Sequence, residues 1–151
     1  MDRLHKKKGD NRGFTFIEII AILVIIGIIS AIAVSRVGVT QQDLISQADI
    51  VKAHLRFAQL KAMQDDTASW SIVFTGNSYT LYNNANPATI NLPSESSNGH
   101  SLTSGVTITN PSTVNFDGWG SPGTTNIPIT LSDGSTTATI TVAANTGYIT
   151  P

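Results

Sequence analysis

The hydrophobic pattern begins with one long apolar run. From Phe14 to Val34 the sequence FTFIEIIAILVIIGIISAIAV has 21 residues and a single charge, Glu18. As a helix it would be about 31 Å long at 1.5 Å per residue, which matches a hydrocarbon core of roughly 30 Å. The pattern therefore predicts a membrane-spanning helix, to which we assign residues 14–38.

The second part of the pattern is amphipathic. From Gln41 to Met63 apolar residues recur at spacings of four and three, as on one face of a helix. This stripe consists of Leu44, Ala48, Val51, Leu55, Ala58 and Ala62. The polar residues lie mostly off the stripe; we expect Asp49 and Lys52 to pair on the surface and His54 to be solvated. Residues 39–65 are thus predicted as a stem helix that packs against a sheet.

The third part consists of short runs rich in β-branched and aromatic residues, separated by Gly, Asn, Pro and Ser. The predicted strands are 69–74, 78–82, 106–109, 113–116, 127–131, 138–142 and 147–150. Hairpin turns are expected at 75–78 and 132–135, and a long polar loop at 83–105. Pro128 should place its strand on a sheet edge.

These elements together predict an α+β fold. A long N-terminal helix, membrane-spanning in its first half and amphipathic in its second, packs on a small antiparallel sheet or sandwich formed by residues 66–151. Alternating strands bury only one face, and the stem helix supplies the apolar surface that covers it. The aromatic residues assigned to core or strand-end packing are Trp70, Phe74, Tyr79, Phe116 and Trp119.

Charge is distributed unevenly along the chain. Residues 1–13 carry five bases and two acids, and no Lys or Arg follows Lys61, although the net charge is only −1. Basic residues ahead of the apolar run predict a cytoplasmic N-terminus and a head across the membrane. A secretory signal is disfavoured, because the run exceeds the usual core of about 7–15 residues. A plain membrane anchor stays open.

Glu18 is the unusual residue of the apolar run. A carboxylate inside such a span costs about 2.5–3.5 kcal/mol and is a functional hypothesis by default. Either it reaches the headgroups from near the end of the span, or it pairs with a cation. No Lys or Arg lies between Arg12 and Arg36, so that cation would come from another chain or from a new amino terminus made by cleavage.

The junction before the run resembles the type IV prepilin signature. Residues 12–18, RGFTFIE, follow a short basic leader and have Gly13, Phe14 and then Glu18 at the fifth position after the glycine. The resemblance implies that a prepilin peptidase cleaves off residues 1–13 and methylates the new amine of Phe14. It also implies that Glu18 pairs with the Phe14 ammonium of a neighbouring subunit during filament assembly, and buried charges are tolerable when paired.

The stem and head resemble, more loosely, the GspH and FimT-type minor subunits. The similarity lies in residues 55–63 (LRFAQLKAM), 114–120 (VNFDGWG), 127–131 and 140–148. It implies a structural minor pilin or pseudopilin without a cofactor. Before assembly it would reside in the bacterial inner membrane with its head in the periplasm, and afterwards in a type II secretion pseudopilus or a type IV pilus; the sequence leaves both open. The implied partners are other subunits, the prepilin peptidase, membrane lipid, and the inner-membrane assembly platform and motor.

The ionisable residues of the head do not form a recognisable catalytic pattern. Glu95 and His100 share the polar loop and can approach each other, while Asp117 and Asp133 precede glycines in turns. No nucleophile motif is present, and calcium, found in some related pseudopilins, would need several oxygen ligands. We therefore predict no catalytic or metal site.

Two further functions are weighed as alternatives. DNA binding is known among FimT-like minor pilins, but duplex affinity depends largely on Lys and Arg. Because neither follows Lys61, we expect residues 41–151 to give no tight complex in a gel shift at low salt; a tight complex would overturn this. The other alternative is a membrane-anchored β-domain that binds a polysaccharide or protein, which persistence of a full-length monomer would favour.

Overall fold

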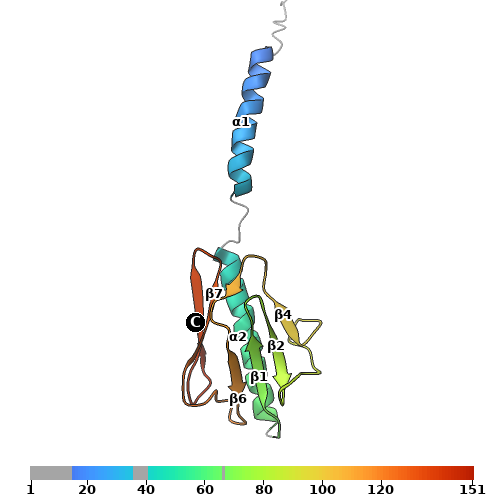
Figure 1. Cartoon of the computed structure of the whole chain (residues 1–151), viewed down its shortest axis with the longest axis vertical. Helices are drawn as coiled ribbons and strands as arrows, with labels where there is room; N and C mark the ends of the chain where they lie inside the picture. The colour runs from blue at the N-terminus through green and yellow to red at the C-terminus, as the bar shows by residue number, and fades with distance from the viewer. Residues whose placement is uncertain (1–14, 36–40, 66) are drawn as a thin grey trace, which may run out of the picture. The chain divides into compact units, whose positions relative to one another are not determined.

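The computed structural model describes residues 15–35, 41–65 and 67–151 of the chain (Figure 1). Two compact units divide after Gly38. The first contains helix α1. The second contains helix α2, which is the predicted stem helix, and nine short strands in the described residues. From here on, "head" means this whole second unit, stem helix included.

Helix α1 spans Phe16–Ser35. Thr15 precedes it as the N-cap, since the Glu18 backbone N–H donates to the Thr15 carbonyl at 3.0 Å and lies 3.4 Å from the Thr15 hydroxyl. Every side chain from 15 to 31 is exposed, so the helix has an apolar surface on all sides. Within the described residues, none of the helices combines the length and apolar character needed to cross a membrane.

Helix α2 spans Gln41–Gln64 and confirms the predicted amphipathic helix. Its buried residues are Leu44, Gln47, Ala48, Val51, His54, Leu55, Ala58 and Ala62. All six members of the predicted stripe are among them. The predicted surface pair is also present, with Lys52 Nζ 2.6 Å from Asp49 Oδ1; such exposed pairs contribute only tenths of a kcal/mol.

Two antiparallel sheets make up the rest of the head. The first contains β1 (Trp70–Phe74), β2 (Ser78–Asn83), β3 (Asn86–Pro87), β4 (Gly99–Ser101) and β6 (Thr113–Phe116). Its order is β3-β2-β1-β6, with β4 also paired to β2. The second contains β5 (Thr107–Ile108), β7 (Ile127–Ser132), β8 (Thr137–Val142) and β9 (Ile149–Thr150), in the order β5-β7-β8-β9.

Helix α2 lies against both sheets and forms one core with them. It contacts β1 and β6 of the first sheet and β7, β8 and β9 of the second (Figure 1). In β8 the alternation is clear, because Ile140 and Val142 are buried whereas Thr139 is exposed. Burial of each large apolar side chain contributes about 1.5–3 kcal/mol. The predicted α+β class, with a helix on antiparallel sheets, is confirmed.

The seven predicted strands all occur, with ends shifted by at most two residues. The hairpin at 75–78 is confirmed by Thr75 N–H donating to the Ser78 carbonyl at 2.8 Å. The second hairpin is shifted by one residue, since Ser132 pairs with Thr137. The prediction that 83–105 is only a loop is wrong, because it contains β3 and β4. Both add to the free edge of β2, and their residues have low strand propensity.

The prediction that Pro128 marks an edge strand is also wrong, since β7 lies between β5 and β8. Strand β5, however, pairs only with Leu131 and Ser132. Beside Pro128 the side chain of Asn110 replaces a neighbouring strand. Its Nδ2 donates to the Pro128 carbonyl at 2.6 Å, and its Oδ1 accepts from the Thr130 N–H at 2.6 Å. Proline lacks an N–H, so no ladder bond is lost there.

Candidate functional site

The predicted processing site precedes helix α1 in the sequence. Gly13 and Phe14, the predicted cleavage and methylation residues, lie outside the described residues. Glu18 is described and sits in the first turn of α1 with its side chain exposed. Between residues 15 and 35 the chain has no basic residue, so this part of the chain offers Glu18 no cation of its own.

The first turn of α1 also shows a local role for Glu18. Thr15 and Glu18 are three residues apart, which is the spacing of a capping box, and the Glu18 N–H points to the Thr15 hydroxyl at 3.4 Å. A carboxylate in the first turn interacts favourably with the helix dipole, by about 0.3–1 kcal/mol. Thr15 is therefore part of the site. The sequence contains this signal, a Thr three residues before a Glu, but the prepilin signature assigns no role to Thr15.

In the head the structure brings together polar residues that the sequence placed far apart. His54 is only 2% exposed, so the prediction that it is solvated is wrong. Its Nε2 lies 2.9 Å from the Pro93 carbonyl and its Nδ1 2.7 Å from the Tyr79 hydroxyl. A carbonyl can only accept, so Nε2 carries the proton and the Tyr79 hydroxyl donates to Nδ1. The loop before β4 thus covers His54.

Glu95 and His100 do approach each other. His100 Nδ1 donates to Glu95 Oε1 at 2.6 Å, and His100 Nε2 lies 3.0 Å from Gln47 Oε1 on α2. Gln47 in turn donates from Nε2 to the Thr103 hydroxyl at 3.0 Å. These bonds attach the segment on either side of β4 to the buried face of α2.

The hydrogen bonds of this cluster hold the segment around β4 against α2. The cluster consists of Gln47, His54, Tyr79, Glu95 and His100. Burial raises the pKa of Tyr79 far above its usual range, so its hydroxyl is no proton source at neutral pH. Burial lowers the pKa of His54, partly opposed by the bond to Pro93. Asp117 and Asp133 each cap their own turn through backbone N–H groups. In the part of the chain that the structure describes, no group of three or more acidic or histidine side chains could hold a metal ion.

The cluster makes the stability of the head dependent on pH. Because burial holds the pKa of His54 below its ordinary 6.5, the unfolded chain binds the proton more readily. The His54 contribution is therefore present above about pH 6.5 and is lost as pH falls through the lowered value; each unit of difference corresponds to about 1.4 kcal/mol. Tyr79, His100 and Glu95 lie around the His54 ring, and all three are retained in a His54→Gln variant.

The measurement is the free energy of unfolding of both proteins between pH 8 and pH 5. Glutamine can keep both hydrogen-bond roles of His54 but does not titrate. Wild type should lose more stability than His54→Gln on acidification. Parallel pH curves for the two proteins would contradict this assignment.

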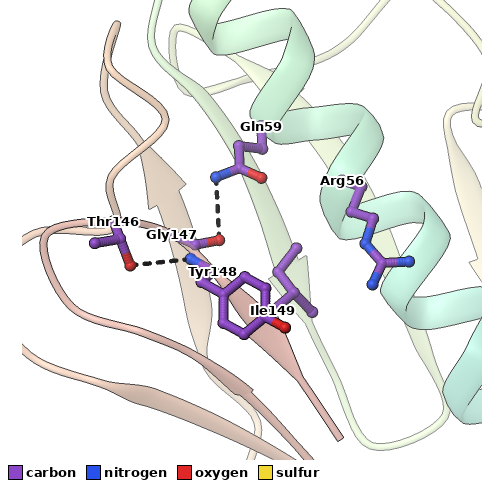
Figure 2. Close-up of a pocket in the computed structure, with 6 residues that line it drawn as sticks. All are labelled: Arg56, Gln59, Thr146, Gly147, Tyr148 and Ile149. Carbon is purple, nitrogen blue, oxygen red and sulfur yellow. Dashed lines mark hydrogen bonds between the residues drawn. The ribbon is translucent and has the colours of Figure 1, made fainter.

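A second feature of the head is the position where two loops meet α2. Gln59 Nε2 donates to the carbonyl of Gly147 at 3.0 Å (Figure 2). The same nitrogen donates to the carbonyl of Gly120 at 2.8 Å. Both glycines have left-handed backbone, with φ of +77° and +64°. A Cβ at Gly147 would overlap the Gly120 carbonyl oxygen and Gln59 Nε2. These contacts fix the loop before β7 and the loop before β9 on one side of the helix.

The aromatic residues near this position divide into two groups. Trp70, Phe74, Tyr79 and Phe116 are buried as predicted, whereas Trp119 is 90% exposed, so its assignment to the core is wrong. The turn that contains Trp119 explains this exposure. Asp117 Oδ1 accepts the N–H groups of Trp119 and Ser121 at 2.9 and 2.8 Å, which directs the Trp119 side chain outward.

Comparison with known proteins identifies the N-terminal segment. Residues 8–34 match the family described as the prokaryotic N-terminal methylation motif. No curated protein and no solved structure is similar enough to this chain to count as a match. The matched segment includes Gly13, Phe14 and Glu18, and it makes the chain prepilin-like. The motif implies processing by a prepilin peptidase and inner-membrane anchoring before assembly.

Proposed function

We propose that this chain is a structural minor pilin or pseudopilin subunit of the GspH/FimT type. A prepilin peptidase cleaves it between Gly13 and Phe14 and methylates the new amine, and the mature subunit enters a type II secretion pseudopilus or a type IV pilus. The observation that carries the proposal is the methylation motif over residues 8–34, with Glu18 in the first turn of an exposed apolar helix.

The surface of α1 supports this role. Its described side chains, 15–31, are all exposed and, apart from Thr15, Glu18, Gly27 and Ser30, all apolar. A helix that is hydrophobic on all sides has to be covered by lipid or by other apolar helices. Lipid would cover it before assembly, and the equivalent helices of neighbouring subunits would cover it afterwards.

Glu18 gives a further reason for the helix to leave lipid and pack against neighbouring subunits. A carboxylate within hydrocarbon is costly unless it is paired, and residues 15–35 contain no base. The Phe14 ammonium of a neighbouring subunit supplies the missing charge. Pairing therefore favours the assembled state over the isolated subunit. The work of extraction comes from a motor outside this chain, because the sequence has no Walker-type loop.

The head supports the proposal through its architecture. The amphipathic helix α2 and two small antiparallel sheets share one core, so the head is a compact folded unit of its own. The strands that carry the looser GspH/FimT resemblance, β6 to β9, are all present. This arrangement suits a subunit whose helix is packed inside a filament while its head contacts neighbours or a secreted client.

Shearing of filaments from cells tests the proposed function. The tagged chain, expressed in a host with the matching assembly machinery, should occur in the membrane fraction and in the sheared filaments. A host without the motor should show only the membrane form. If the chain stays a full-length membrane monomer while other subunits assemble normally, the proposal fails and the anchored β-domain that binds a polysaccharide or protein is favoured.

A further inference from the structure

Two aromatic side chains stand exposed beside the last turns of α2. Trp119 is 90% exposed and Tyr148 is 69% exposed, although tryptophan is on average a strongly buried residue. Trp119 precedes Gly120, and Tyr148 follows Gly147. Because one Gln59 nitrogen holds the carbonyls of both glycines, the two aromatic residues lie on the same side of the head.

The backbone under these rings is held firmly. Asp117 fixes the turn around Trp119 through three hydrogen bonds, to the N–H groups of Trp119, Gly120 and Ser121. A Cβ on Gly120 would press against both Gln59 and Met63 at 3.0 Å, so the turn sits directly on the helix. A rigid loop that presents an exposed aromatic ring loses little entropy when it binds a partner.

A hollow lies beside each ring. Arg56, Gln59 and the segment 146–149 line one of about 420 Å³, shown in Figure 2. Met63, Gln64, Gly118 and Trp119 line the other, of about 520 Å³. Both volumes fall within the range of roughly 300–1,000 Å³ typical of ligand sites. Gln59 and Met63 are four residues apart, so the two hollows are neighbours along one face of α2.

The first hollow has a free positive charge. The bases among the described residues of the head are Lys52, Arg56 and Lys61. Lys52 pairs with Asp49, and Lys61 lies 5.5 Å from the centre of the Phe57 ring. Arg56 makes no ion pair or hydrogen bond with any described residue, and no acid lines its hollow. A guanidinium in this setting matches a carboxylate, which it binds through two parallel hydrogen bonds.

The two exposed rings alone are small for the centre of a protein interface and suit a sugar. An aromatic side chain buries about 150–250 Å², so Tyr148 and Trp119 together supply at most about 500 Å². A stable protein interface needs roughly 800 Å² on each side. A sugar needs far less, because its C–H face stacks on one aromatic ring while its hydroxyls take hydrogen bonds at the rim.

We propose that this surface binds an acidic polysaccharide, with a uronate residue in the hollow of Figure 2. The uronate carboxylate binds Arg56, and the C–H face of its ring stacks on Tyr148. Gln59 Oε1, which has no partner among the described residues, accepts a sugar hydroxyl, and the Thr146 hydroxyl binds another. Trp119 stacks a second sugar of the same chain. This binding role is independent of the filament role.

The fluorescence of Trp119 gives a direct test. The chain has two tryptophans, and the other, Trp70, is buried. Full-length protein in detergent micelles is titrated with tetramers of galacturonate, glucuronate-containing hyaluronan and mannuronate. At least one should shift the emission to shorter wavelength in a saturable way. Arg56→Gln and Tyr148→Ala should each weaken that binding by about tenfold or more.

Controls separate the site from general effects. Lys61→Gln removes the same charge from the same helix outside the hollow and should bind as wild type does at constant ionic strength. A neutral galactose tetramer and tetraglutamate should bind at least about tenfold more weakly. No saturable shift with any uronate tetramer overturns the proposal. So does equal weakening by Arg56→Gln and Lys61→Gln, and so does equal affinity for tetraglutamate, which would indicate a peptide carboxylate as the partner.

Discussion

The Gly147→Ala variant is expected to lose about 2–5 kcal/mol of the free energy of unfolding. Gly147 has φ +64°, a conformation that costs a residue with a Cβ about 1–2 kcal/mol. The new Cβ would also overlap the Gly120 carbonyl oxygen and Gln59 Nε2. Relief of that overlap separates Gln59 from both carbonyls, at about 0.5–1.5 kcal/mol for each hydrogen bond. The midpoint of thermal unfolding should fall by roughly 10 °C.

Gly134→Ala is the matched control for this variant. Gly134 also has left-handed backbone, with φ +88°, but a Cβ there meets nothing within 4 Å. This variant should therefore lose only the backbone part, about 1–2 kcal/mol. Thermal unfolding of both variants, followed by circular dichroism, compares them directly. Equal losses at the two positions would show that the contact of Gly147 with Gln59 and Gly120 contributes nothing to stability.

The Glu18→Ala variant is expected to enter the membrane normally but to fail in assembly. Removal of a carboxylate makes insertion of an apolar segment easier. In the filament it leaves the Phe14 ammonium of a neighbouring subunit buried without a partner, which costs about 3–5 kcal/mol. This corresponds to a loss of incorporation of about a hundredfold or more. The amount of chain in sheared filaments, divided by the amount in the membrane, measures the effect.

A Glu18→Gln variant separates charge pairing from helix capping. Glutamine, like glutamate, can complete a capping box with Thr15, but it has no charge to offer an ammonium group. If pairing is what matters, Glu18→Gln should assemble as poorly as Glu18→Ala. Normal incorporation of Glu18→Gln would refute the pairing role and leave Glu18 as a residue of the first helical turn.

The local pattern of the sequence predicts the scaffold of the head well. The stripe from Leu44 to Ala62 becomes the buried face of α2 because its period matches the helix and its members are apolar. The longer strands follow for the same reason. Strand β8, for example, alternates between Thr and Ile or Val. Such elements are encoded by neighbouring residues, so they can be read without knowledge of the tertiary structure.

The features that the sequence does not predict depend on distant partners. His54 lies beside the apolar stripe, three residues after Val51 and four before Ala58, but a polar residue there does not by itself predict burial. Contacts with Tyr79 and Pro93, distant in sequence, complete its burial. Strand β4 contains Gly99 and has little strand propensity; it exists because β2 offers a free edge. Trp119 looks like a core residue until the Asp117 side chain is seen to cap its turn.

The two candidate sites differ in how far the sequence predicts them. Gly13, Phe14 and Glu18 are predicted from motif and spacing alone, and the proposed cleavage and pairing require them in this order. The structure adds Thr15 and the exposed first turn of α1. The surface formed by Arg56, Tyr148 and Trp119 was not predicted, because these residues come from three separate segments. Gln59 joins these segments through its bonds to Gly120 and Gly147.

Mass spectrometry of the mature N-terminus tests the central claim most directly. The chain is purified from cells that contain an active prepilin peptidase, and its N-terminal peptide is sequenced. The proposal predicts a protein of 138 of the 151 residues that begins at Phe14 and carries a methyl group on its amine. An intact Met1 in those cells would contradict it.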